Sequence, residues 1–426
     1  MIKCLKLKGI VVLLAGACAL FLNMSYAEIL TPAAVLKRVL SKNSELAAME
    51  SKFLSQDYAI RSSYSLQDPK IGIMQEKNMT RMEQEMGAMK TWSVSQEILF
   101  PTKYFAKGAT QRASASVARQ EFLNKKLDLR QKALTSYFNF YAGEKILKLR
   151  MAQKDTLRQI ARVAEAKRGA GTASQQDEMK SHVEQTRVEN ELLLQKLELI
   201  ELQSDLNAIL NFPPNKEMTL PETELKKPIL QSPLKDVSKL TKNSKIIETQ
   251  EAVLKKASAE KTLAWMSYLP DLMLTYQEPY GSNKPENAYS LGVEMSIPLW
   301  FFTKQTSEVA SSKAAVWEAR NTLIQTKIDV DAKAQTMASA VETYDKLLSI
   351  FETALIPQAE STLKASHSAY SAGKVGFVEL LDSQNTLYSI KMDYYRNIAK
   401  YVDVLLSLER LVAQSLSDLP FEGGGL

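Results

Sequence analysis

The sequence has little cysteine and histidine, with two of each in 426 residues, and no long apolar run beyond its first 27 residues. Both cysteines, Cys4 and Cys18, lie in that N-terminal segment, so the rest of the chain can form no disulfide. Two isolated histidines give no Ser/His/Asp arrangement, and no GxxxxGK[ST] phosphate-binding motif occurs. The composition therefore predicts a non-enzyme without a cofactor. Any membrane crossing would require β-strands rather than an apolar helix.

The first 27 residues have the layout of a secretory signal peptide. Three lysines precede an apolar run over residues 10–22, and small residues ending at Ala27 mark a cleavage position. An uncleaved N-terminal anchor and a lipid-modified Cys18 in "LAGAC" are the alternatives. Removing the three lysines lowers the formal net charge from +6 to +3, which is too weak to indicate nucleic acid as a partner.

The rest of the chain contains an internal repeat of two similar halves. "DPKIGIMQE" and "WSVSQEILFPTKYFAKG" in the first half correspond to "LPDLMLTYQE" and "YSLGVEMSIPLWFFTKQ" in the second. Pro101 matches Pro298 and Glu97 matches Glu294, at a constant shift of 197 residues. Further on, "RGAGTASQQD" corresponds to "YSAGKVGFVE". Each half is therefore predicted to contain a helix, two strands, and a long helical hairpin.

These patterns predict four regions after the signal peptide, residues 1–27. The first repeat spans 28–211, with strands at about 69–77 and 91–99 and a helical hairpin over 102–211 whose tip lies near 169–174. A proline-rich connector covers 212–236. The second repeat spans 237–415, with strands at about 271–278 and 288–297 and a hairpin over 299–415 whose tip lies near 371–376. A tail follows at 416–426.

The strands alternate apolar and small polar residues, as in "YSLGVEMSI". This pattern suits a barrel with lipid outside and water inside, and it also suits a soluble hairpin with one buried face. The long helices carry sustained heptads and no proline between Thr102 and Phe212, which indicates coiled-coil packing. Pro357 lies inside the second hairpin and should break or kink it.

The combination of duplicated strand pairs, "SQEILFPTKYFAKG" and "AYSAGKVGFVELLDSQNTLY" resembles the TolC family of outer-membrane efflux proteins. The resemblance implies a mainly α protein with a small β part. It implies a homotrimer in which four strands per protomer complete a 12-stranded transmembrane β-barrel above a periplasmic α-helical tunnel. It further implies a site in the outer membrane of a Gram-negative bacterium, in contact with outer-membrane lipid. The partners would be a periplasmic membrane-fusion adaptor protein and an inner-membrane pump of RND or ABC type.

The resemblance also assigns roles at the helix tips. Glu379 and Asp382 occupy the positions of carboxylates that ring the periplasmic aperture, where they would attract cations. Asp177 matches a carboxylate that accepts a hydrogen bond from the tyrosine matching Tyr370. An arginine that constrains the tip in the family's prototype falls at Val375 here, so that link is missing.

Glycines mark the helix-tip turns, because glycine permits the chain to reverse direction between two helices. In the first repeat this residue is Gly171, and in the second the pair is Gly373 and Gly376.

Methionine is concentrated in "MQEKNMTRMEQEMGAMK", between the first two predicted strands. Thioether sulfur suits Cu(I), and methionine is also a flexible hydrophobe that fills gaps. The metal-binding hypothesis concerns four residues: Met79, Met82, Met86 and Met89. It would make the protein a passive exit duct for Cu/Ag or other heavy-metal cations. The alternatives are a duct for drug efflux or type I protein secretion, and a non-channel periplasmic coiled-coil structural protein.

Overall fold

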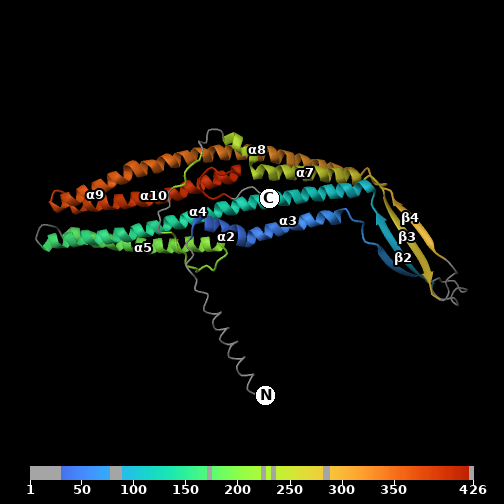
Figure 1. Ribbon diagram of the computed structural model, residues 1–426, viewed down its shortest axis with the longest axis horizontal. Coiled ribbons are helices and arrows are strands. Elements are labelled where there is room, and N and C mark those ends of the chain that lie inside the picture. Colours follow the sequence, from blue (N-terminus) through green and yellow to red (C-terminus); the bar gives the residue numbers. More distant parts are fainter. Residues whose placement is uncertain are drawn as a thin grey trace, which may run out of the picture.

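The computed structural model describes residues 30–76, 89–169, 175–221, 227–231, 237–281 and 288–421. It is a long helical body with a four-stranded sheet at one end (Figure 1). The first repeat contains α2 (Pro32–Lys42), α3 (Ser44–Ser63), β1 (Lys70–Glu76), β2 (Met89–Ile98), α4 (Pro101–Gly169) and α5 (Gln175–Ile209). The second contains α6 (Val237–Leu240), α7 (Lys245–Met266), β3 (Asp271–Tyr280), β4 (Ser290–Ser296), α8 (Lys304–Ile350), α9 (Ile356–Ser371) and α10 (Phe377–Val412).

The first hairpin is built on one uninterrupted helix. α4 has 69 residues, which corresponds to about 100 Å at 1.5 Å per residue. It begins at Pro101, where the fixed φ of proline suits the first helical turn and its missing N–H leaves no bond unmade. α5 returns alongside α4, so the end of α4 at Gly169 and the start of α5 at Gln175 lie at the end of the molecule far from the sheet (Figure 1).

The second hairpin is interrupted where the sequence places its proline. α8 ends at Ile350, a π-helical turn covers Phe351–Leu355, and α9 resumes at Ile356 with Pro357 in its first turn. A π-turn accommodates the proline, because the wider ring shifts the hydrogen-bonding pattern where an N–H is absent. The expected kink is therefore a local widening. The hairpin predicted from residue 299 begins instead at Lys304, because residues 299–303 form turns that present exposed Trp300, Phe301 and Phe302.

The four strands form one antiparallel sheet in the order β1-β2-β3-β4. The pairing of β2 with β3 joins the two repeats, with Val94 opposite Tyr276. On one face the register aligns apolar residues across the sheet: Ile71, Ile73, Trp92, Val94, Leu272, Leu274, Leu291 and Val293. The opposite face carries small and polar residues, including Ser93, Ser95, Thr275 and Gly292. The alternation read from the sequence is therefore a property of the whole sheet.

The main hydrophobic core lies midway along the molecule, where both hairpins meet the short helices and the connector. Fully buried residues of α4 and α10, such as Leu134, Tyr137 and Leu405, form its centre. The Tyr137 hydroxyl donates to the Leu30 carbonyl at 2.8 Å, and the Tyr401 hydroxyl donates to the Pro228 carbonyl at 3.1 Å. These buried bonds attach the N-terminal segment and the connector to the helices.

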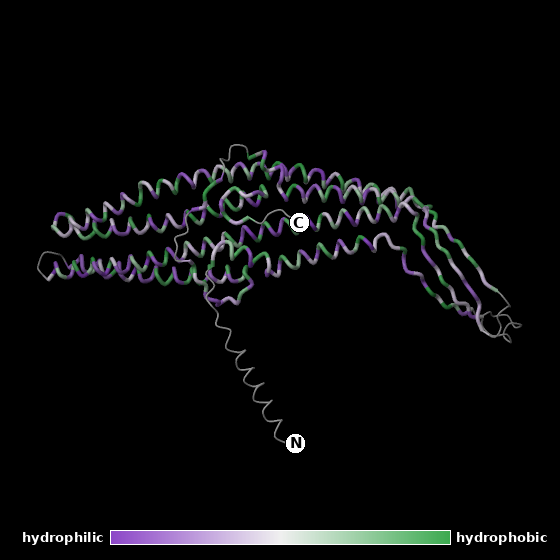
Figure 2. Tube along the Cα trace, in the orientation of Figure 1, coloured by the Kyte–Doolittle hydropathy of each residue, from purple (hydrophilic) through white to green (hydrophobic). Residues whose placement is uncertain are grey.

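Hydrophilic and hydrophobic residues alternate along the helices, as Figure 2 shows. No helix in the part of the chain that the structure describes is both long and apolar enough to cross a membrane.

Candidate functional site

The turn between α9 and α10 depends on the conformation of one glycine. Gly373 has a φ of +71°, which a side chain would strain. Its N–H donates to the Tyr370 carbonyl at 3.1 Å, and the Lys374 N–H donates to the Ala369 carbonyl at 2.9 Å. These bonds close the end of α9 in the manner of a Schellman motif. Gly376 is the N-cap of α10, as expected for a turn residue, whereas Gly171 lies outside the described residues.

The second hairpin tip packs on the first through a small apolar cluster, separate from the main core. It contains Ile160 and Ala164 of α4 with Tyr370, Phe377 and Leu380 of the second hairpin. The Tyr370 and Phe377 rings meet edge to face, with centroids 6.1 Å apart. Val375 packs against the same cluster. The position that carries arginine in the family prototype therefore contributes apolar packing here.

A lysine from the first hairpin contacts Tyr370. Lys167, in the last turn of α4, donates a hydrogen bond from its ammonium group to the Tyr370 carbonyl. The same ammonium lies 4.2 Å from the centroid of the Tyr370 ring. Nothing in the sequence marks Lys167, because its pattern is that of a solvated lysine, and it becomes distinctive only when the two hairpins lie side by side.

The hydrogen bond implied between Tyr370 and Asp177 is not formed in the protomer. The Tyr370 hydroxyl is buried and has no hydrogen-bond partner among the described residues. Burial raises the pKa of Tyr370, and the nearby negative charge of Asp177 raises it further. Asp177 therefore lies within electrostatic range of Tyr370, while the ring and carbonyl of Tyr370 make the contact between hairpins.

The two carboxylates assigned to the aperture lie on the first turns of α10. Glu379 and Asp382 are both exposed and three residues apart, so they share one face of the helix. A carboxylate oxygen of Glu379 lies 2.6 Å from the position that a Cβ on Gly376 would take, so this side chain folds back over the N-cap. Asp382 lines a cavity of about 510 Å³ together with Arg150 and Arg187. Whether the two carboxylates form a ring remains a prediction about the assembled trimer.

Polar side chains hold the two hairpins together on the side of the apolar cluster that is farther from the tip. The Gln384 amide donates to the Gln153 carbonyl at 3.1 Å, and the Gln153 side chain donates to Asn385 at 3.1 Å. Asn385 in turn donates to Glu184 of α5 at 2.9 Å. Because Gln153 and Gln384 are buried, this network fixes the lateral position of α10 on the first hairpin.

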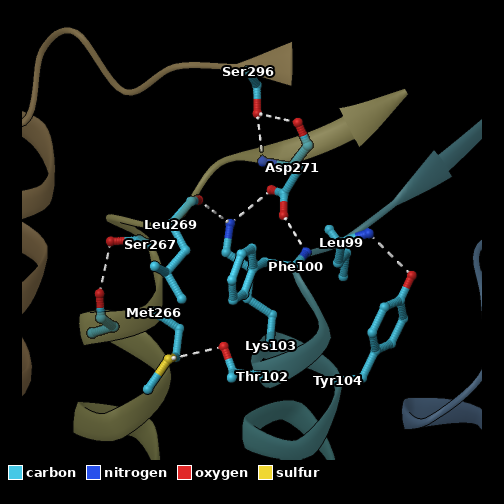
Figure 3. A network of polar contacts seen from close by, with 11 residues as sticks. Leu99, Phe100, Thr102, Lys103, Tyr104, Met266, Ser267, Leu269, Asp271 and Ser296 are labelled. Atoms are coloured by element: carbon cyan, nitrogen blue, oxygen red, sulfur yellow. Dashed lines mark hydrogen bonds and ion pairs between the residues drawn. The ribbon is translucent and has the colours of Figure 1, made fainter. Parts of the chain in front are cut away.

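At the opposite end, one ion pair anchors the sheet to the helices (Figure 3). The Lys103 ammonium lies 2.7 Å from Asp271 and donates to the Leu269 carbonyl at 2.8 Å. Asp271 also accepts from the Phe100 N–H at 3.0 Å, while its own N–H donates to Ser296 at 3.0 Å. The carboxylate of Asp271 thus connects β3 to the turn after β2 and to the start of α4, and the backbone N–H of the same residue connects β3 to β4.

The polar face of the sheet carries acidic residues in one row. Glu97 on β2 lies opposite Met273 on β3, which lies opposite Glu294 on β4. The internal repeat already pairs Glu97 with Glu294, but their placement on one row depends on the register between the repeats.

The predicted methionine cluster is not placed by the structure. Met79, Met82 and Met86 lie outside the described residues, and Met89 is described only by its backbone, at the start of β2.

This fold and its tips can be compared with known proteins. A family model described as outer membrane efflux protein matches residues 237–414. The cobalt-zinc-cadmium resistance protein CzcC of Cupriavidus metallidurans is 20% identical over 387 residues, covering 90% of each chain. The solved structure of the outer-membrane channel OprN aligns with a TM-score of 0.77 at 14% identity, covering 90% of each chain. The outer membrane protein VceC of Vibrio cholerae aligns with a TM-score of 0.75 at 14% identity, covering 90% of this chain and 96% of VceC.

The four-stranded sheet and the two long hairpins together give the chain the fold of the outer-membrane channel OprN and of the outer membrane protein VceC. Residues 237–414 match the outer membrane efflux proteins, and the chain as a whole resembles the TolC-type efflux ducts of the outer membrane, which have a large periplasmic helical part. This family forms trimers, works in tripartite efflux systems, and consists of transport ducts rather than enzymes.

Proposed function

We propose that this chain is the outer-membrane exit duct of a tripartite pump for heavy-metal cations. The observation that carries the proposal is the relation to CzcC, which is named a cobalt-zinc-cadmium resistance protein and matches over 90% of both chains. The substrate class is inferred from that name, because the fold serves ducts of several kinds.

The charges along the path support a cationic solute. The polar face of the sheet carries Glu97 and Glu294 in one row, and the tip of the second hairpin carries Glu379 and Asp382. In a trimer each of these positions occurs three times around the same axis. Rings of carboxylates favour cations and disfavour anions.

Trimerisation is supported by the sheet itself. β1 and β4 are its two edges, and each has an unpaired side in the protomer. Unpaired backbone groups cannot be left in hydrocarbon, and pairing β1 of one protomer with β4 of the next would close a barrel of 12 strands. Energy would come from an inner-membrane pump of RND or ABC type, connected by a periplasmic adaptor protein.

A deletion strain tests the substrate class. Growth would be measured on cobalt, zinc, cadmium, copper and silver salts, and in parallel on dyes and antibiotics. We expect sensitivity to at least one metal, restored by the wild-type gene. Sensitivity to dyes and antibiotics alone would instead indicate drug efflux, and a defect confined to a secreted protein would indicate type I secretion.

The same strain tests the methionine hypothesis. Complementation with Met79, Met82, Met86 and Met89 all changed to Leu keeps the apolar volume and removes the thioether sulfurs. If the cluster relays Cu(I) or Ag(I), this variant fails to restore growth on copper or silver while restoring every other phenotype. Full restoration on copper and silver would assign the methionines to packing.

A further inference from the structure

The C-terminus of α9, at the tip of the second hairpin, is capped by a residue of the first hairpin. The last carbonyls of α9 carry the negative end of the helix dipole, and the Tyr370 carbonyl is one of them. The turn after α9 already supplies one donor to this carbonyl, the Gly373 N–H at 3.1 Å. The Lys167 ammonium supplies another from α4. A positive charge at a helix C-terminus stabilises it, and here that charge comes from the other hairpin.

The same ammonium has a second attachment. It lies 4.2 Å from the centroid of the Tyr370 ring, within the range of a cation–π interaction. The ring is buried against Phe377, and the apolar cluster with Ile160 and Ala164 lies around it. Exclusion of water from the ring strengthens the attraction, so Lys167 holds both the backbone and the side chain of one residue.

The neighbouring basic residue behaves differently. The Arg168 guanidinium lies 2.5 Å from Glu178 of α5, and therefore ties together the two helices of the first hairpin. Lys167 is the residue that reaches across to the second hairpin at this level. Moving the two tips apart breaks the Lys167 contacts to Tyr370 and exposes the apolar cluster, whereas the Arg168 ion pair stays intact within its hairpin.

We propose that Lys167 is a cationic latch that holds the two hairpin tips of each protomer together and keeps the periplasmic end of the duct closed. The latch acts through the carbonyl and the ring face of Tyr370. The Tyr370 hydroxyl, which is buried without a hydrogen-bond partner among the described residues, takes no part in it. The proposal is independent of the solute that the duct carries.

The test is the single-channel conductance of the purified trimer in planar bilayers with KCl. Lys167→Met should populate the open tip about tenfold more, because a charge-assisted hydrogen bond and a partly desolvated cation–π contact are lost together. Lys167→Arg keeps the charge and the donors, and should retain the low conductance of the wild type. Lys374→Gln, which removes an exposed lysine on the adjacent turn, is the matched control and should change nothing.

Substitutions of Tyr370 distinguish the contribution of its ring from that of its hydroxyl. Tyr370→Phe keeps the ring and the carbonyl and should leave the tip closed. Tyr370→Leu removes the ring and should raise the conductance. A Tyr370→Phe variant as open as Tyr370→Leu would overturn the proposed role of the ring and assign the tip to the hydroxyl.

Chemical rescue excludes misfolding as the cause. Because both cysteines lie in the first 18 residues, the Lys167→Cys variant offers a unique thiol after cleavage of the signal peptide. A methanethiosulfonate that attaches an ethylammonium group should return this variant to low conductance, and a reagent that attaches an ethylsulfonate should not. Wild-type trimer treated with either reagent is the control. If Lys167→Met conducts like the wild type, or if both reagents act alike, the latch is refuted.

Discussion

At the scale of single residues, the most buried charges among the described residues hold the segment that follows α10. Arg130 of α4 and Glu409 of α10 lie 2.7 Å apart, with 3% and 0% of their side chains exposed. Glu409 also accepts hydrogen bonds from the N–H groups of Leu416 and Ser417, at 2.8 and 3.0 Å. Arg130 donates to the Pro420 carbonyl at 2.9 Å. Burial lowers the pKa of Arg130 against the opposing effect of the Glu409 charge.

We therefore expect Arg130→Met to be strongly destabilising, by about 3–5 kcal/mol, because it leaves the Glu409 carboxylate buried without its counter-ion. Adding Glu409→Gln should recover part of this loss, since the amide oxygen still accepts from the tail and no charge remains. Thermal unfolding of the detergent-solubilised trimer, followed by circular dichroism, measures both variants. If Arg130→Met alone is as stable as the variant that also carries Glu409→Gln, the buried Glu409 charge is not the cause of the destabilisation.

At the scale of elements, α4 and α10 are also joined by a partly solvent-exposed network of ion pairs. Asp128 of α4 lies 3.0 Å from Lys132 and 3.3 Å from Arg410 of α10. Burial alone would raise the pKa of Asp128, but the hydrogen bond from Lys132 and the surrounding positive charges outweigh it and lower the pKa. The carboxylate is thus stabilised in its charged form by folding.

This shift predicts a pH-dependent contribution to stability. A carboxylate whose folded pKa is lowered stabilises the protein above its unfolded pKa of about 3.9, and the contribution is lost as the pH falls through the folded pKa. Asp128→Asn should therefore lower the stability by about 1 kcal/mol at neutral pH. The difference from wild type should shrink as the pH falls below about 4. Unfolding midpoints at pH 7 and pH 3 measure it. The matched control is Asp155→Asn, which removes an exposed partner of Arg158 within α4.

At the scale of the whole molecule, the two faces of the sheet have different surroundings once the trimer is inserted. Val293 on β4 belongs to the apolar face and is 70% exposed in the protomer, a surface that suits lipid. Ser290, on the same strand, belongs to the polar face opposite Gln277.

A lysine at Val293 would place a charge in hydrocarbon, at a cost of about 2–4 kcal/mol per protomer near the middle of the bilayer. We expect Val293→Lys to abolish outer-membrane trimers, whereas Ser290→Lys should form trimers whose cation conductance is reduced by the added positive charge. Membrane fractionation followed by unheated gel electrophoresis scores assembly. Trimers formed equally by both variants would refute the orientation of the sheet.

Much of the fold could be predicted because its signals are local or repeated. The strand alternation, the proline-free stretch of α4 and the glycines at residues 373 and 376 each act within a few residues. The tip contacts were harder to predict. The resemblance identifies the tyrosine but pairs its hydroxyl with Asp177, and that hydroxyl is unpaired among the described residues. No local pattern marks Lys167, because its role depends on a residue 203 positions away.

The duplicated plan, the amphipathic strands and the lack of cysteine beyond residue 18 can all be read from the sequence alone, because periodicity and composition act along the chain. Which distant groups meet depends on how the helices and strands pack. This packing brings Glu97 and Glu294 to one row, joins Arg130 to Glu409, and sets Lys167 on Tyr370. The physical reason is that ion pairs, cation–π contacts and strand register depend on the approach of separate elements, which packing rather than local pattern fixes.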